Sequence, residues 1–354
     1  MSYASASANA HTSLSTTSSP THAEAHSKSS ISSLAAIWAS RYVRVVNAYG
    51  CSQPKYQVEN PDELVSEAGR SRTAAQALKH LNRSSAAAWA LTDDLLSDEI
   101  PKHGIPLEAI DPWQIAADTH SLFKLMFQAY AEGKPPQRLS VIIGSRFGKI
   151  RQRHTAGDPR VIGFMSMHLH YTGQKLLEKL SPLERSLVHP YFKVMDDHMY
   201  MPLRDACDAA ANHEMDSPAL IAVQHLLAVS TTIARSVCNH VSRVHAGYET
   251  YSGRLISPTV RTSSIRDVEM FQVYLCLCTL EGHLRSVQRE LFPLCVMLYP
   301  QLNVSWQLVQ DMLKVLRWEM YDHLSPKDMQ VFLPHLQALT EMFSPAVFQP
   351  SLTL

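Results

Sequence analysis

The sequence predicts an all-α protein, and three observations support this fold class. Only 12 of the 354 residues are glycine, which is few for a turn-rich all-β chain. Hydrophobic residues make up 45% of the chain, enough to bury a sizeable core. Apolar side chains recur at spacings of three and four residues, the period of amphipathic helices. We therefore expect a bundle of helices.

The N-terminal part is predicted to be a tail followed by helices. Residues 1–30 are rich in Ser, Ala, Thr and His, lack the apolar core of a secretory signal, and are expected to be disordered. From Ile31 onward apolar residues return at helical spacing, and a second helical region is expected over 62–97. A strong helix is predicted over Pro112–Ala131, with an apolar stripe that includes Trp113, and Gly133–Pro136 ends it.

The segment after this helix is the hardest to assign. Val141-Ile142-Ile143 indicates a short strand or a buried turn. A basic run suits either a solvated linker or a docking strip for an acidic partner; it comprises Arg146, Lys149, Arg151, Arg153 and Arg160. We place a domain boundary here, so that 31–160 form an N-terminal helical region of unknown function and 161–350 a second helical domain.

Two helices of the second domain have clear starts. In Ser181-Pro182-Leu183-Glu184 a serine precedes a proline, and the glutamate stands where it closes a capping box. Ser325-Pro326-Lys327-Asp328 repeats this arrangement. Asp196-Asp197-His198 is expected on a packed helix that presents its polar residues to solvent. A long apolar helix is expected over Val268–Leu280.

Ser264-Ile265-Arg266-Asp267 directly precedes that helix, and this stretch resembles the Cys-x-Arg-Asp signature of phycobiliproteins without the cysteine. The similarity covers roughly residues 180–350 and is one of spacing and character. Its other matches are Leu180-Ser181-Pro182, Phe271, the helix break at Glu281-Gly282, Val287, Leu291, a turn at Met297–Pro300, and the start Leu324–Asp328. The resemblance implies a globin-like phycobiliprotein-type bundle, preceded here by a helical N-terminal region.

The resemblance also suggests a cofactor site. In phycobiliproteins the cysteine anchors a bilin, while Arg and Asp hold its propionate and pyrrole nitrogens. Ser264 replaces that cysteine, so no covalent bilin is expected. Two interpretations of Arg266 and Asp267 stay open: a helix-start ion pair kept for stability, or a clamp for a non-covalently bound tetrapyrrole. His240, His245 and His283 are the candidates if that tetrapyrrole is haem.

Other classes of function find less support in the sequence. Lys+Arg and Asp+Glu both number 32, so no charge excess favours nucleic-acid binding. We find no metal-ligand spacing, no complete catalytic motif and no membrane span. The six cysteines form no CxxC pair and are expected to be buried free thiols in a reducing cytosol.

The function expected from the sequence is therefore non-enzymatic. The first interpretation is a phycobilisome- or photosynthesis-associated interaction or regulatory protein without a covalent bilin. It would be cytoplasmic, or thylakoid-adjacent, with phycobilisome subunits as partners and homo-oligomers as a further form of association. The alternative is a carrier or sensor that holds a bilin or haem non-covalently through Arg266 and Asp267.

Overall fold

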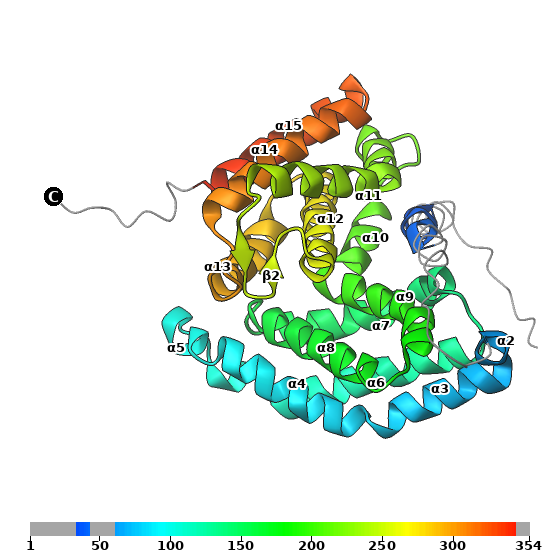
Figure 1. Cartoon of the computed structure of the whole chain (residues 1–354). Coiled ribbons are helices and arrows are strands. Elements are labelled where there is room, and N and C mark those ends of the chain that lie inside the picture. The colour runs from blue at the N-terminus through cyan, green and yellow to red at the C-terminus, as the bar shows by residue number, and fades with distance from the viewer. Residues whose placement is uncertain (1–32, 43–60, 345–354) are drawn as a thin grey trace, which may run out of the picture.

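A computed structural model describes residues 33–42 and 61–344, and these residues confirm the all-α prediction. Apart from one two-stranded hairpin, the regular elements of these two ranges are helices (Figure 1). The predicted disordered tail at 1–30 and Cys51 lie outside the described residues. The globin-like character of the bundle stays a prediction.

The elements follow one another without a long interruption. In the first half they are residues 33–42, α2 (Pro61–Val65), α3 (Glu67–Lys79), α4 (Leu81–Leu96), α5 (Glu99–His103), the 3-10 helix η1 (Leu107–Ala109), α6 (Pro112–Ala131), α7 (Pro136–Thr155), α8 (Val161–Leu177) and α9 (Pro182–Tyr200). In the second half they are α10 (Leu203–Ala210), α11 (Pro218–Val244), the strands β1 (Glu249–Thr250) and β2 (Gly253–Arg254), α12 (Pro258–Glu281), the π-helix η2 (Val287–Leu291), α13 (Phe292–Gln301), α14 (Trp306–His323) and α15 (Pro326–Met342).

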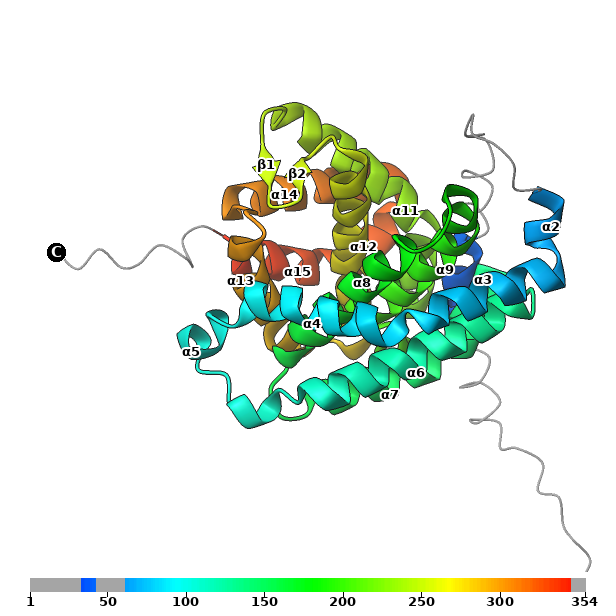
Figure 2. The same ribbon diagram turned by 60° about the horizontal axis from the view of Figure 1, so that its bottom comes forward.

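Helices from both predicted domains share one core. In the lower layer of Figure 1, α4 packs along α8, α3 along α6, and α7 along α9. Figure 2 shows α3, α4, α6 and α7 crossing this layer together. Helices α8 and α9 follow the boundary predicted near residue 160, yet they pack on helices that precede it. One continuous cluster of buried apolar side chains joins this layer to α11–α15.

Helix α12 is the central helix of the second half. It packs against α11, α10, α15 and α9. Every residue from Val268 to Leu280 is buried, because the segment is apolar on nearly all sides. The helix begins at Pro258, ten residues earlier than the sequence suggested. Arg266 and Asp267 therefore lie in its third turn, and the prediction that they stand at a helix start is wrong.

Several predicted helix ends are confirmed. Ser181 and Ser325 both form capping boxes, at the starts of α9 and α15. Gly282 ends α12 in a left-handed conformation, with φ of 70°. Glycine adopts this conformation without the steric cost that other residues meet, which explains the predicted break.

The prediction of a strand or turn at Val141–Ile143 and of a solvated linker after it is wrong. Both segments belong to α7, whose buried residues Leu139, Ile143, Phe147 and Ile150 recur at helical spacing against α9. Arg151, from the basic run, is buried and forms an ion pair with Glu290 at 2.9 Å. Helical packing overrode the strand preference of the β-branched residues.

Other expectations from the sequence can also be compared with the structure. Trp113 is 86% exposed on α6 and does not join the apolar stripe. Met297–Pro300 continues α13 instead of turning. The five cysteines in the described ranges are free, and all but Cys207 are buried. Within those ranges α11 is apolar and long enough to cross a membrane, but half of its apolar window is buried in the core, as in many core helices of globular proteins.

Candidate functional site

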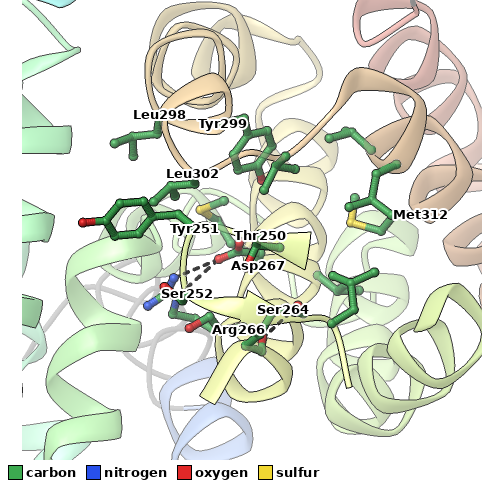
Figure 3. A pocket seen from close by; sticks show the side chains of 18 of the residues that line it. Thr250, Tyr251, Ser252, Ser264, Arg266, Asp267, Leu298, Tyr299, Leu302 and Met312 are labelled. Carbon is green, nitrogen blue, oxygen red and sulfur yellow. Dashed lines mark hydrogen bonds and ion pairs between the residues drawn. The ribbon is translucent and has the colours of Figure 1, made fainter. Parts of the chain in front are cut away.

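A cavity of about 270 Å³ lies between α8, α11, α12, α13 and α14 (Figure 3). The hairpin β1–β2 covers part of it through Thr250, Tyr251 and Ser252. Most of the wall is aliphatic or contains sulfur; these residues are Met167, Val237, Cys238, Val241, Leu255, Val260, Val268, Met270, Leu294, Cys295, Leu298, Leu302, Val304, Leu308, Val309 and Met312. Such a wall suits an apolar ligand, because it offers dispersion contacts without competing hydrogen bonds.

Both residues predicted as a cofactor clamp line this cavity. Arg266 and Asp267 come from the third turn of α12 and form an ion pair, with Nη2 3.1 Å from Oδ1 (Figure 3). Their side chains are 13% and 26% exposed. Ser264, at the position of the missing cysteine, also lines the cavity and donates its hydroxyl proton to the carbonyl of Val260 at 2.9 Å.

Arg266 is held by groups that sequence analysis did not connect with it. Its guanidinium lies 3.8 Å from the ring centroid of Tyr200, and its Nη1 is 3.9 Å from a carboxylate oxygen of Asp196. Asp196 in turn accepts a hydrogen bond from His170 at 2.8 Å. His170 is on α8, and Asp196 and Tyr200 are on α9. The three lie some 65 to 95 residues before Arg266 in the chain, so no local motif could have indicated them.

Burial affects the two carboxylates beside Arg266 in different ways. Burial raises the pKa of Asp267, and Arg266 opposes this only in part. Asp196 is partly buried, which raises its pKa, but His170, Arg266 and Lys193 together bring that pKa below the ordinary value. Asp196 is therefore the more firmly ionised member of the group.

The cysteines of the cavity are poor nucleophiles. Burial raises the pKa of Cys238 to about 12 and shifts that of Cys295 upward as well. At neutral pH both are thiols, whereas the thiolate is the reactive form.

A second cavity, of about 340 Å³, adjoins the first. The two share His170, Gln174, Ser263 and Arg266. The wall of the second cavity contains more charged side chains, because Lys193, Asp196 and Asp197 contribute to it. It borders a buried ion cluster in which Lys193 pairs with Asp197 at 3.0 Å and with Glu269 at 3.5 Å, and Arg41 pairs with Glu269.

The Asp196-Asp197-His198 segment does not face solvent as predicted. Asp197 is 1% exposed, because its carboxylate takes part in this ion cluster. His198 is buried against Phe147, with Nε2 2.8 Å from the hydroxyl of Ser140. These groups can be buried because each has a partner.

The histidines suggested for haem do not reach either cavity. His240 is exposed, His245 pairs with Asp311 at 3.2 Å, and His283 pairs with Glu281 at 3.4 Å. His170 is the histidine that lines the first cavity, and it was not among the candidates. No group of three metal-ligating side chains occurs in residues 33–42 and 61–344.

Comparisons of this chain with protein-family models, with curated proteins and with solved structures find no match. The resemblance to phycobiliproteins therefore stays a prediction, and the function has to be inferred from the cavity itself.

Proposed function

We propose that this chain is a non-enzymatic protein that binds an elongated or flat, largely apolar molecule in the cavity beside α12. The observation that carries the proposal is an apolar cavity with one ion pair, Arg266–Asp267, in its wall. Apolar walls provide affinity through burial, and a few fixed polar groups orient the ligand.

The size of the site fits this class of ligand. Pockets for drug-sized molecules measure about 300–1,000 Å³. The first cavity lies just below this range at about 270 Å³, and the adjoining cavity adds about 340 Å³. A ligand that extends past Arg266 into the second cavity has room for a ring system or a long chain.

The groups in the cavity favour binding over catalysis. The ring nitrogens of His170 are engaged by Asp196 and Gln174, both at 2.8 Å. The hydroxyl of Ser264 is used in a bond to its own helix, and the thiols are protonated. Covalent catalysis needs an activated nucleophile, and neither the protonated thiols nor the engaged hydroxyl of Ser264 supplies one.

A linear tetrapyrrole is the first ligand to test, because of the similarity around Arg266 and Asp267. With Ser264 in place of a cysteine, the pigment would be held without a thioether. Its absorption band would then leave the protein on denaturation in acid and urea. The proposal does not depend on this particular ligand, since the cavity accepts other conjugated molecules of similar shape.

Ser242→Trp is expected to block the site. Ser242 lies on α11, is half-buried and lines the cavity, so an indole ring at this position takes up space that the ligand needs. We expect the dissociation constant for biliverdin, or for an apolar fluorescent dye, to rise at least tenfold, which corresponds to about 1.4 kcal/mol. Absorption or fluorescence titration of the purified chain measures this.

Val244→Trp is the matched control. Val244 is on the same helix, two residues later, and is 64% exposed outside the cavity. This variant should bind like the unaltered chain. Equal losses in both variants, or saturable binding that neither affects, would place the ligand elsewhere and contradict the proposal.

A second candidate function, the binding of phycobilisome subunits, is favoured by two aromatic side chains on α14. Trp318 and Tyr321 are 61% and 46% exposed and lie three residues apart, so they share one face. Exposed aromatic residues often dominate the energy of protein interfaces.

Replacing Trp318 and Tyr321 with alanine is expected to weaken co-sedimentation with purified phycobilisomes by about 2 kcal/mol or more, since aromatic side chains at the centre of an interface contribute that much. Trp113→Ala removes an even more exposed indole from α6 and serves as the control. An unaltered double variant, or a loss with Trp113→Ala alone, would argue against an interface on α14.

A further inference from the structure

The positive and negative charges around the two cavities are unequal in number. Seven of them line the cavities or belong to the ion pairs that extend from the cavity walls: the cations Arg41, Lys193 and Arg266, and the carboxylates Asp196, Asp197, Asp267 and Glu269. Arg261 is nearby on α12 but lines neither cavity. Apart from the histidines, these groups carry one more negative than positive charge; His170, which is hydrogen-bonded to Asp196 at 2.8 Å, adds a cation only when it is protonated.

The excess is located at Arg266. Glu269 and Asp197 have Arg41 and Lys193 as partners, two cations for two carboxylates. Among the described Lys and Arg residues, Arg266 is the one that pairs with the other two carboxylates, at 3.1 Å from Asp267 and 3.9 Å from Asp196, which is also hydrogen-bonded to His170.

In each of these two carboxylates, one oxygen atom has no hydrogen-bond donor among the described residues. Asp267 accepts the bonds from Arg266 through Oδ1, and Asp196 accepts from His170 through Oδ2. No hydrogen bond from the described residues reaches Oδ2 of Asp267 or Oδ1 of Asp196. Both side chains keep about a quarter of their surface accessible, at 26% and 23%, and line the cavities. A partly buried carboxylate oxygen without a donor is stabilised when a charged group donates a hydrogen bond to it.

We infer that the natural ligand is an amphipathic monocation, with its apolar body in the first cavity and its protonated nitrogen at Asp267, within the field of Asp196. This inference rests on the proposed function and names the ligand's chemical class. It argues against a linear tetrapyrrole as the natural ligand, because the propionates of such a pigment are carboxylates. A carboxylate at the same place would be the third negative group around a single guanidinium. A neutral ligand would leave the excess charge uncompensated. Tyr171 and Tyr251 also line the cavity, and aromatic side chains of this kind attract cations.

Three probes that share one apolar part and differ only in their terminal group test the inference. Each has the same alkyl chain with an environment-sensitive fluorophore, and ends in a primary ammonium, a hydroxyl or a carboxylate. At pH 7 the ammonium probe should bind the full chain roughly tenfold more tightly than the alcohol, as expected for one charge-assisted hydrogen bond. The carboxylate probe should bind most weakly. The preference should persist in about 0.5 M salt, because partly buried charges are screened less than surface charges.

Asp267→Asn tests the assigned contact. The amide keeps the shape of the side chain and an acceptor for Arg266, but removes the charge that attracts the ligand. The ammonium and alcohol probes should then bind within about threefold of each other. Asp322→Asn, on the exposed surface of α14, removes a charge far from the cavities and should leave the preference intact.

The outcomes separate this inference from the proposed function. If no probe binds, the proposed function fails. If the three bind but the alcohol equals the ammonium, or the carboxylate is tightest, the cavity binds ligands and the inference is wrong. A preference that disappears in salt, or survives Asp267→Asn, would also overturn it.

Discussion

Replacing Arg41 with methionine is expected to lower the free energy of unfolding by about 3–5 kcal/mol, because Glu269 then stays buried without its closest cation. Arg41 and Glu269 are 7% and 0% exposed in their side chains. The guanidinium also donates to Thr231 at 3.0 Å and covers the ring of Trp38 at 3.6 Å. Although burial alone would raise it, Arg41 and Lys193 hold the pKa of Glu269 at about 2.

Urea denaturation of both variants of a matched pair measures this effect. Arg72→Met breaks the exposed ion pair with Glu63, whose partners are 60% and 57% exposed, and should cost at most about 1 kcal/mol. Arg41→Met combined with Glu269→Leu should lose less stability than Arg41→Met alone, since no unpaired charge remains at that position. Equal costs for Arg41→Met and Arg72→Met would mean that residues 33–42 are not anchored as described.

The fold is expected to lose stability steeply between pH 6.5 and pH 4. Burial lowers the pKa of His198 to about 3, and burial followed by the nearby His120 lowers that of His168 to about 4. The unfolded chain has histidine pKa values near 6.5, so in this window the unfolded state binds protons that the folded state does not. Each histidine then removes about 1.4 kcal/mol per pH unit, and the pair about 2.7.

The sign of the effect is set by the direction of these pKa shifts. The stabilisation is complete above about pH 6.5 and disappears as the pH falls through the folded values of the two histidines. Glu269 acts in the same direction but only below its unfolded pKa of about 4.5. Asp197 and Asp267, whose pKa values are raised by burial, act in the opposite direction.

Urea midpoints at half-unit steps from pH 7 to pH 4 measure the slope. His198→Gln keeps a partner for Ser140 but does not titrate, so the slope should fall to about half of its original value. A stability that stays flat down to pH 4.5 would contradict the assignment of His168 and His198 as buried neutral groups.

Local signals in the sequence predicted much of the helical structure. The helix over Pro112–Ala131 has the predicted bounds, because Asp111 caps it and Gly133 follows its end. The capping boxes at Ser181 and Ser325 are confirmed for a similar reason, since all their atoms come from four consecutive residues. Such signals need no knowledge of tertiary contacts.

The errors come from features that depend on packing. Val141–Ile143 favours a strand locally, but contact of α7 with α9 makes it helical. Arg151 was counted as part of a basic run, whereas a partner 139 residues away, Glu290, allows it to be buried. Sequence-based reasoning cannot place such partners side by side.

In the candidate site, too, neighbouring residues were predicted and partners distant in the sequence were missed. Arg266 and Asp267 were predicted as a pair, and they do meet at the wall of a cavity. His170, Asp196 and Tyr200 come from other helices and were missed. They position Arg266, and Asp196 changes the charge balance around it. The chemical class of the ligand depends on that balance, so it could be inferred only once the fold was known.

Native mass spectrometry of the full chain, purified without denaturant from the cells that produce it, tests the central claim most directly. We expect a population with the added mass of one small molecule per chain, released on denaturation in acid and absent from Ser242→Trp but present in Val244→Trp. A chain that has only its own mass, and that also fails to bind the ammonium, hydroxyl and carboxylate probes, would contradict the account of the cavity as a ligand site.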